Sequence, residues 1–279
     1  MHKPKVSVIM GVYNCQDTVA ESIESIIQQT YQNWELIICD DASTDSTYEK
    51  VLHYAKREPD RIRLIRNKTN QRLAASLNRC LAEAKGRWIA RQDGDDVSVP
   101  TRLEKQVHFL ETNPDYDVVG TAMTVFDESG TKGVRALVSE PDRRVLARGT
   151  PFCHGTIMMK ASAYNTLNGY RSVKATRRME DIDLWIRFYE AGMKGFNLKE
   201  PLYLVREDEA AFKRRKFRYS MDNAWLVFTA CWRLRLPPVD YLFAFKPMIR
   251  ACLSPKIMKL YHQRKLGTPL FRRRTIRDE

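Results

Sequence analysis

Trp88-Ile-Ala-Arg-Gln-Asp-Gly-Asp-Asp96 is a short apolar run of β character that ends abruptly in three carboxylates, those of Asp93, Asp95 and Asp96. Like charges packed at a strand end repel one another and are costly to desolvate, so a positive partner is expected there. Mg²⁺ and Mn²⁺ take oxygen ligands and are typically held by one or two carboxylates together with substrate phosphates. The pattern therefore predicts a metal–diphosphate site at a strand end, with a solvated acidic turn as the alternative.

Upstream of this stretch, strands and helices are expected to alternate. Apolar runs and amphipathic spacing predict three strands, each followed by a helix, in the order 6–10, 19–27, 34–39, 48–55, 62–65 and 73–84. Thr18-x-x-Glu21 has the pattern of a capping box at the start of the first helix. Such alternation indicates a parallel sheet with helices on both faces, in which ligands bind beyond the carboxyl ends of the strands. Asn14, the pair Asp40–Asp41 and the acids at 93–96 fall at these ends, so we expect them to meet in one crevice.

Downstream, the pattern indicates a mixed rather than a purely parallel sheet. It predicts a helix from Pro100, a strand at 117–126, a turn at 127–130, a strand at 156–160 and a helix at 179–189 with acids in its first turn. Past Pro201 the strand–helix pattern is expected to give way to basic helical pieces. We therefore predict an α/β domain over 1–205 and a basic, aromatic helical region over 206–279.

Composition and charge indicate a globular protein with an anionic partner. The 279 residues are 43% hydrophobic and 29% charged, with a net charge of +13. Residues 206–279 hold 18 Lys and Arg against 7 Asp and Glu, so about +11 of that charge lies in the last quarter. Nucleic acid, an acidic membrane surface and phosphorylated substrates are all attracted by such a charge.

Cysteine spacing and apolar run length indicate the compartment. The six cysteines are scattered without a C-x-x-C pair, as expected of reduced thiols in the cytosol. The N-terminus runs straight into a strand pattern, so no signal peptide is expected. The longest uncharged apolar run, 224–232, is far shorter than the roughly 20 residues that a membrane-spanning helix needs. If the protein meets a membrane, we expect it to lie on the surface.

Four segments, in order along the first 200 residues or so, resemble the motifs of family 2 glycosyltransferases of the GT-A fold. They are Val6-Ser-Val-Ile-Met-Gly-Val-Tyr-Asn14, Ile38-Cys-Asp-Asp-Ala-Ser-Thr-Asp45, Asp93-Gly-Asp-Asp96 and Glu180-Asp-Ile-Asp-Leu-Trp185. The resemblance implies a Rossmann-like nucleotide-binding half and a nucleotide-sugar donor, most often a UDP-sugar. The donor-binding residues that it implies are Val12, Tyr13, Asn14, Asp41, Arg72, Asp93 and Gly94.

The resemblance also implies roles in the chemistry. Tyr13 would stack on the uracil and Asp41 would hydrogen-bond its edge, while Arg72 would reach the base or the phosphates. Asp95 would hold a Mn²⁺ or Mg²⁺ ion that neutralises the leaving diphosphate, supported by Asp96.

The remaining roles fall on the acids at 180–183. Asp181 would deprotonate the attacking hydroxyl, and Glu180 or Asp183 would orient this base or touch the acceptor. A single displacement through an oxocarbenium-like state inverts the anomeric centre.

Each of these residues has a structural alternative. The acids Glu180, Asp181 and Asp183 could simply be favoured by the helix dipole. Tyr13 could be a core aromatic, and Asp41 and Ser43 could be helix caps. His154 is expected to be structural, with contact to the diphosphate or metal as the alternative. Trp185 and Phe188 are expected in the core, and Arg102 is expected to be a surface or bracing charge.

The region 206–279 combines basic clusters at 213–216 and 272–274 with six aromatic residues between 225 and 245. This composition is typical of an interfacial helix on anionic lipid, although it also suits nucleic acid, an oligomer contact or a solvated face. Because residues 1–205 resemble a glycosyltransferase, we expect peripheral contact with the inner leaflet of a bacterial cytoplasmic membrane rather than with nucleic acid. A lipid-linked or glycan acceptor of cell-surface polysaccharide synthesis would be presented there. The competing functions are a sugar nucleotidyltransferase and a non-catalytic nucleotide-sugar-binding module.

Overall fold

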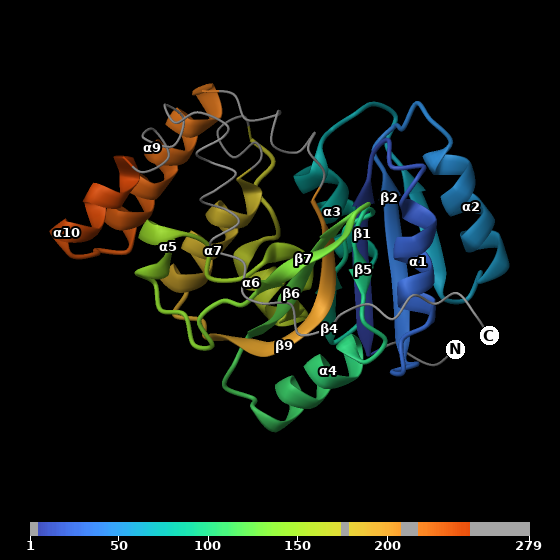
Figure 1. The fold of residues 1–279 in the computed structure, drawn as a ribbon, viewed down its shortest axis with the longest axis horizontal. Coiled ribbons are helices and arrows are strands. Elements are labelled where there is room, and N and C mark those ends of the chain that lie inside the picture. The colour runs from blue at the N-terminus through green and yellow to red at the C-terminus, as the bar shows by residue number, and fades with distance from the viewer. Residues whose placement is uncertain (1–4, 174–178, 208–216, 246–279) are drawn as a thin grey trace.

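The computed structural model describes residues 5–173, 179–207 and 217–245 (Figure 1). The first part of the chain alternates strand and helix as predicted, through β1 (Val6–Val12), α1 (Val19–Ile27), β2 (Trp34–Asp40), α2 (Thr47–Arg57), β3 (Ile62–Arg66), α3 (Leu73–Glu83) and β4 (Trp88–Arg91). The second part contains β5 (Val97–Ser98), α4 (Arg102–Thr112), β6 (Val118–Asp127), β7 (Gly130–Arg135), α5 (Val145–Arg148), the 3₁₀ turn η1 (His154–Thr156), β8 (Met158–Lys160), α6 (Ala161–Leu167) and α7 (Glu180–Glu190). The chain continues through β9 (Gly195–Arg206), α9 (Phe217–Arg233), α10 (Pro238–Tyr241) and η3 (Leu242–Phe245).

The strands form one mixed sheet in the order β3-β2-β1-β4-β8-β6-β9-β5, with β7 paired to β6. β1 runs parallel to β2 and β4, and β2 runs parallel to β3. β8 is antiparallel to both β4 and β6, which makes the sheet mixed as predicted. Val12 is level with Asp40 in the β1–β2 register, so these two strands end together. The parallel half therefore presents its loops at one edge, where the predicted crevice residues lie.

Alternating side chains of the central strands build a core on each face of the sheet. On β1, Val8 and Met10 pack with α1 and α4, while Ile9 packs on the opposite face with α3 and α7. Figure 1 shows α1 and α2 at one end of the molecule and α5, α7 and α9 at the other. The sheet is thus the middle of three layers, and the site elements emerge from its edge.

The prediction that strand structure ends near Pro201 is wrong, because β9 continues through this proline to Arg206. The pairing of β9 with β6 shifts register between Thr121 and Met123, opposite Pro201. A proline cannot donate to a sheet ladder, and such an irregularity is where a strand tolerates one.

The predicted capping box is also not formed. Thr18 precedes α1, but its side chain does not cap the helix. Its hydroxyl instead donates to the carbonyl of Gly94 at 2.9 Å, and Glu21 pairs with Arg206 at 2.5 Å. Both side chains therefore connect α1 to the acidic loop and the end of β9.

The described part of 206–279 packs on the rest of the protein. Val227, Ala230 and Cys231 of α9 belong to the same buried cluster as Trp185 of α7. Arg144 and Arg148 form ion pairs with the buried carboxylate of Asp240. The division into two domains remains a prediction, and the basic clusters at 213–216 and 272–274, like Cys252, lie outside the described residues. Among the described helices, none has the length and apolar character that crossing a bilayer requires.

Candidate active site

The acidic loop after β4 is held by a buried arginine that the sequence analysis did not single out. Arg91 is fully buried at the end of β4, and its guanidinium donates to Asp93 Oδ1 at 2.5 Å. The Asp93 backbone N–H donates to the hydroxyl of Tyr203 on β9 at 3.0 Å. A Cβ on Gly155 would lie 2.9 Å from Asp93 Oδ2, so the third side of this carboxylate is also closely packed. Asp93 is therefore fixed in place from β4, β9 and η1.

Asp96 is turned into the protein and holds the loop to β9. Its Oδ1 accepts the backbone N–H of Arg206 at 2.9 Å, and its side chain is buried. Burial, followed by the charges of Asp93 and Asp95, raises the pKa of Asp96 well above its usual range. This arrangement suits the supporting role predicted for Asp96 better than direct contact with an ion.

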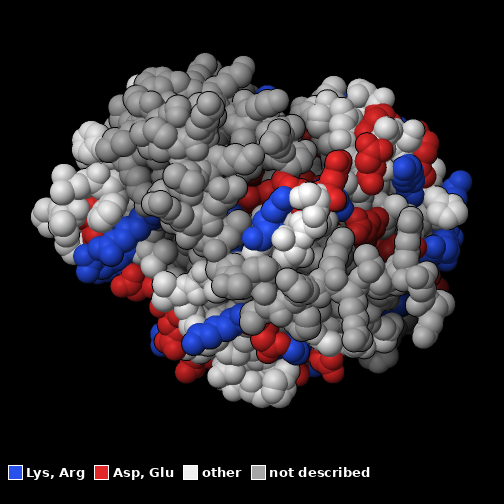
Figure 2. Space-filling model, in the orientation of Figure 1, with Lys and Arg blue, Asp and Glu red and all other residues white. Residues whose placement is uncertain are grey.

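Asp95 occupies the exposed tip of the same loop. Protein atoms crowd the carboxyl on its other sides, and this partial desolvation, followed by the charge of Asp93, raises its pKa to about 6. A backbone N–H of its own loop acts on this carboxyl in the opposite direction and lowers the pKa. Figure 2 shows acidic side chains gathered in the middle of this face. An exposed carboxylate beside a like charge is suited to binding a cation, because the cation offsets the repulsion between the two carboxylates.

The acids of the loop do not form a complete protein cage for a metal ion. Within 5–173, 179–207 and 217–245 there is no group of three or more His, Cys, Asp or Glu side chains placed to hold one. Mg²⁺ typically keeps waters and binds one or two carboxylates plus substrate phosphates. Asp95, with Asp93 behind it, fits that kind of site, in which phosphate oxygens complete the coordination.

Gly94 allows the acidic loop to pack against the end of β1. A Cβ at this position would lie 2.9 Å from Val12 Cγ1 and 3.1 Å from Cys15 Sγ. Because the valine is buried at the end of β1, the Gly94→Ala variant should lose about 1–3 kcal/mol in the free energy of unfolding by overpacking. Urea unfolding tests this. Gly149→Ala is the control, because its added Cβ meets nothing within 4 Å; equal losses in both variants would contradict the packing argument.

The loops after β1 and β2 meet as predicted. Tyr13 is 48% exposed, so the alternative that it is a core aromatic is wrong, and its ring is available for stacking. Asn14 has a left-handed backbone with φ of 49°, and its Oδ1 accepts the Thr44 N–H at 2.9 Å. This bond joins the two loops.

Asp41 organises a third loop rather than capping α2. Its Oδ1 accepts from Asn67 Nδ2 at 2.7 Å and from the Gln71 N–H at 2.8 Å. Its Oδ2 accepts the backbone N–H of Arg72 at 2.7 Å. A carboxylate has about four acceptor sites, so one remains for a ligand such as a base N–H. Ser43 accepts the Asn14 N–H and likewise does not cap α2.

The backbone of Arg72 is held in a strained conformation in the loop that Asp41 organises. Its φ of 77° and ψ of 168° lie in a region that favours glycine and costs other residues roughly 1–3 kcal/mol. The side chain is exposed. Strain at an exposed position is consistent with a side chain kept for binding.

Replacing Arg72 by glycine should stabilise the fold and weaken donor binding. Relief of the strain exceeds the entropy cost of glycine, so the free energy of unfolding should rise by about 1 kcal/mol. The backbone bond to Asp41 is kept. Urea unfolding and UDP titration measure the two effects, and Arg72→Lys is the control that keeps both charge and strain. Undiminished UDP affinity in the glycine variant would remove Arg72 from the donor site.

α7 presents its acids in the first turn, as predicted. Burial, followed by the charge of Glu180, raises the pKa of Asp181 to about 6, and the positive charge of Arg91 acts in the opposite direction. Arg91 therefore forms an ion pair with Asp93 and has a smaller influence on the pKa of Asp181. Asp183 is buried and paired with Arg187 at 2.8 Å and Arg171 at 3.3 Å, so its described contacts brace the fold.

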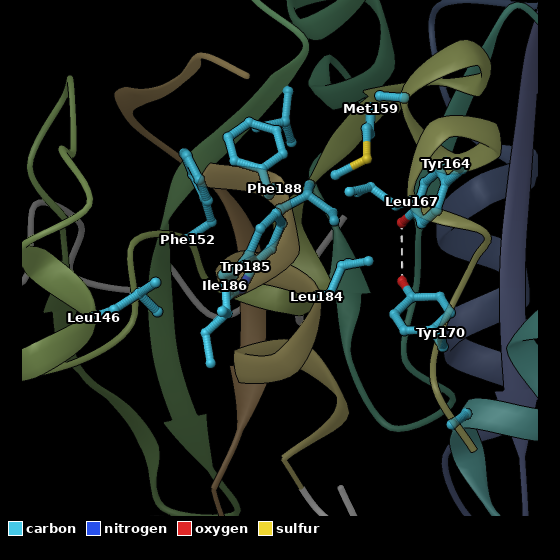
Figure 3. Packing of buried hydrophobic residues seen from close by; sticks show 14 of the residues in the cluster. Leu146, Phe152, Met159, Tyr164, Leu167, Tyr170, Leu184, Trp185, Ile186 and Phe188 are labelled. Carbon is cyan, nitrogen blue, oxygen red and sulfur yellow. Dashed lines mark hydrogen bonds between the residues drawn. The ribbon is translucent and has the colours of Figure 1, made fainter. Parts of the chain in front are cut away.

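The far side of α7 is anchored in the core. Trp185 and Phe188 are fully buried, as expected, and Trp185 lies 4.8 Å from Phe152 between ring centroids (Figure 3). This packing fixes the helix that carries Asp181.

His154 belongs to a polar chain at the edge of this core. Its Nε2 lies 2.8 Å from the hydroxyl of Tyr170. That hydroxyl in turn lies 2.9 Å from the hydroxyl of Tyr164 (Figure 3). Burial and the nearby Arg91 lower the pKa of His154 to about 3, so it is neutral. The Tyr170 contact uses one ring nitrogen, in keeping with the expected structural role, and its contact with an ion stays a prediction.

Arg102 braces the site from below. It is fully buried, and its guanidinium donates to Gln92, Ser98 and the Arg91 carbonyl. The expectation of a bracing charge is confirmed, and a surface position is excluded.

The comparisons with known proteins now identify the family. The family model described as Glycosyl transferase family 2 matches residues 7–167. A Bacillus subtilis (strain 168) protein, "Putative glycosyltransferase EpsE", is 64% identical over 263 residues, which cover 94% of this chain and 95% of that protein. The chain belongs to glycosyltransferase family 2. The Escherichia coli protein "UDP-Glc:alpha-D-GlcNAc-diphosphoundecaprenol beta-1,3-glucosyltransferase WfaP" is 45% identical over 107 residues, 38% of this chain and 41% of that protein.

Solved structures confirm the GT-A fold. S. aureus TarS 1-349 in complex with UDP superposes with a TM-score of 0.65 at 16% identity, covering 92% of this chain and 78% of that chain. The Pyrobaculum calidifontis mannosyltransferase PcManGT, in complex with GDP-Man and Mn²⁺, has a TM-score of 0.61 at 20% identity and covers 94% of this chain and 79% of that chain. At these identities the likeness concerns the fold, and the family assignment makes the protein a glycosyltransferase.

Proposed function

We propose that this family 2 enzyme transfers a sugar from a UDP-sugar, with inversion, to a hydroxyl of a lipid-linked or glycan acceptor in cell-surface polysaccharide synthesis. One observation carries the proposal: the fold holds an exposed acidic loop at the end of β4 through the ion pair of the buried Arg91 with Asp93, and it also presents Asp181 in the first turn of α7. The site thus combines a place for a diphosphate and cation with a base.

The donor half is supported by the three loops at the sheet edge. Tyr13 offers an exposed ring, Asp41 keeps one acceptor site, and Arg72 adds a positive charge beside them. These groups suit a uracil base and its phosphates. TarS was solved with UDP and WfaP is named for a UDP-glucose donor, which supports uracil, whereas the GDP-mannose of PcManGT shows that the fold also accepts guanine.

Asp95, backed by Asp93 and Asp96, would hold Mn²⁺ or Mg²⁺. The chemistry supplied there by a divalent ion would be that of a Lewis acid that neutralises charge on the leaving diphosphate. Asp93 is held in place by its ion pair with Arg91. Asp96 keeps the loop against β9 through the Arg206 N–H, so the Asp95 carboxylate stays at the tip.

Asp181 would act as the general base. Its carboxylate takes the proton from the acceptor hydroxyl while the new oxygen–carbon bond forms and the bond from the anomeric carbon to the diphosphate breaks. A pKa of about 6 makes a better proton acceptor than an ordinary aspartate and leaves Asp181 ionised at neutral pH. Attack opposite to the leaving group inverts the anomeric centre.

The acceptor and location are proposed by analogy. WfaP is named for an undecaprenol-diphosphate-linked acceptor, and such lipids lie in the bacterial cytoplasmic membrane. The protein would then act at the inner face of that membrane.

Release of the nucleotide tests the proposal. The protein is mixed with a panel of UDP-, GDP- and dTDP-sugars, with Mn²⁺ and a synthetic polyprenyl diphosphate-sugar acceptor, and nucleoside diphosphate release is measured together with the anomeric configuration of the product. We expect a UDP-sugar to be used and a product of inverted configuration. A preference for GDP- or dTDP-sugars would overturn the uracil assignment, and release of pyrophosphate from UTP and a sugar phosphate would indicate a nucleotidyltransferase.

A further inference from the structure

α9 is apolar on two opposite faces, although only one face is buried. Val227, Ala230 and Cys231 of α9, together with Leu234 just after it, pack into the core shared with α7. The residues with helical spacing on the other face are exposed: Met221, Trp225, Phe228 and Trp232. A surface helix normally carries polar residues on its outer face. The outer face of α9 therefore indicates contact with something apolar.

Some of these exposed side chains already contact one another. Trp225 and Trp232 are each 70% exposed. The rings of Trp225 and Phe228 stack with centroids 6.0 Å apart, and Phe228 meets Tyr241 edge-on at 5.4 Å. Leu242 and Phe245 of η3 are 68% and 57% exposed and extend this apolar character beyond α10. We call Met221, Trp225, Phe228, Trp232, Leu242 and Phe245 the aromatic face.

Basic groups accompany the aromatic face. Arg235 is exposed just after α9, and Arg143 and Arg148 of the α5 region are exposed as well, while Arg144 and Arg148 form ion pairs with Asp240. Figure 2 shows a blue patch of Lys and Arg side chains in the part of the molecule where Figure 1 has α5 next to α10. Amphipathic tryptophans flanked by arginines are favoured at the headgroup level of a bilayer, where the ring is buried and the charge meets anionic lipid.

We propose that the aromatic face is a docking surface for an anionic lipid bilayer. A second copy of the chain fits less well, because a two-fold interface would place the same patch against itself and bring the arginines of the two copies together. The net charge of +13 adds to this repulsion, whereas an anionic surface is attracted by it. Arg233 of α9 is paired with Glu190 of α7, so docking by α9 would also orient the helix that carries Asp181.

Tryptophan fluorescence tests the proposal directly. Of the five tryptophans, Trp34, Trp88 and Trp185 are buried, so a response to lipid reports Trp225 and Trp232. The full chain, without nucleotide, is titrated with vesicles of phosphatidylglycerol and phosphatidylethanolamine and with vesicles of phosphatidylcholine alone. We expect a blue shift and quenching by brominated acyl chains with the anionic vesicles, weakened by added salt. Absence of a shift with anionic vesicles would overturn the proposal.

A matched pair of variants separates the aromatic face from the general charge. Trp225→Gln/Trp232→Gln should lower vesicle partitioning by about tenfold or more, because the apolar area that enters the membrane is removed. Val138→Gln, at another exposed apolar position, should partition like the native protein. Unchanged partitioning of the double variant would contradict docking on a bilayer. So would a native protein that is dimeric and does not bind vesicles, if the double variant is a monomer. These readouts need no sugar transfer, so they stand whether or not the proposed reaction is correct.

Discussion

Asp95→Asn is expected to lower the turnover number by about 10³-fold, since a metal ion supplies several kcal/mol of stabilisation to a leaving diphosphate. The same change should stabilise the metal-free fold at pH 7.5. The pKa of Asp95 is raised to about 6 from 3.8, so the folded state binds its proton more readily than the unfolded chain. The unfavourable charge is therefore present above about pH 6, and the stability of the native protein rises as pH falls from 6 toward 4.

Nucleoside diphosphate release measures the turnover number, and thermal unfolding with and without Mn²⁺ and UDP measures the stability. The melting temperature of the native protein should rise when Mn²⁺ and UDP are added together. Asp95→Asn should have a higher melting temperature without these ligands and a much smaller rise when they are added. Asp115→Asn, at an exposed position between α4 and β6, is the control for loss of one negative charge. A variant that retains both the response to Mn²⁺ and the turnover number would show that Asp95 does not hold the ion.

The parallel half of the fold was predictable because its signals are local. Alternating residues such as Val8 and Ile9, capping-type loops and the glycine at 86 each report on their own segment. β9 was missed because Pro201 reads as a strand terminator and the compensating irregularity lies on β6, about 80 residues earlier in the chain. Pairing partners at that separation cannot be read from one segment.

The site shows the same division. The acids at 93–96 could be found from sequence because charge at the end of an apolar run is conspicuous. The contacts of each acid could not be found in this way. Asp96 accepts the backbone N–H of Arg206, 110 residues away, and the backbone N–H of Asp93 donates to the hydroxyl of Tyr203. Arg91 had a visible signal, a charge inside an apolar run, but its significance depends on its complete burial. The distinction between the outward Asp95 and the inward Asp96 is thus tertiary information.

Asp181→Asn should lower the turnover number by about 10²–10⁴-fold while leaving UDP binding intact, because an amide cannot accept the proton of the acceptor hydroxyl. Transfer to acceptor measures the first quantity, and UDP titration in the presence of Mn²⁺ measures the second. Asp183→Asn is the comparison: it breaks a buried pair with Arg187, so it should mainly lower stability. Loss of UDP affinity in Asp181→Asn would place this carboxylate in donor binding instead.

The pH dependence of kcat/KM tests the same assignment of Asp181 as the base, through a change at Glu180. A base with a pKa of about 6 must be ionised, so kcat/KM should fall by about tenfold per pH unit below that value. After burial, the charge of Glu180 is the next cause that raises this pKa. Glu180→Gln removes the charge, so ionisation of Asp181 becomes easier and the acidic limb should move to lower pH. An acidic limb that stays in place in this variant, or that persists in the residual activity of Asp181→Asn, would assign it to another group, of which Asp95 is the first candidate.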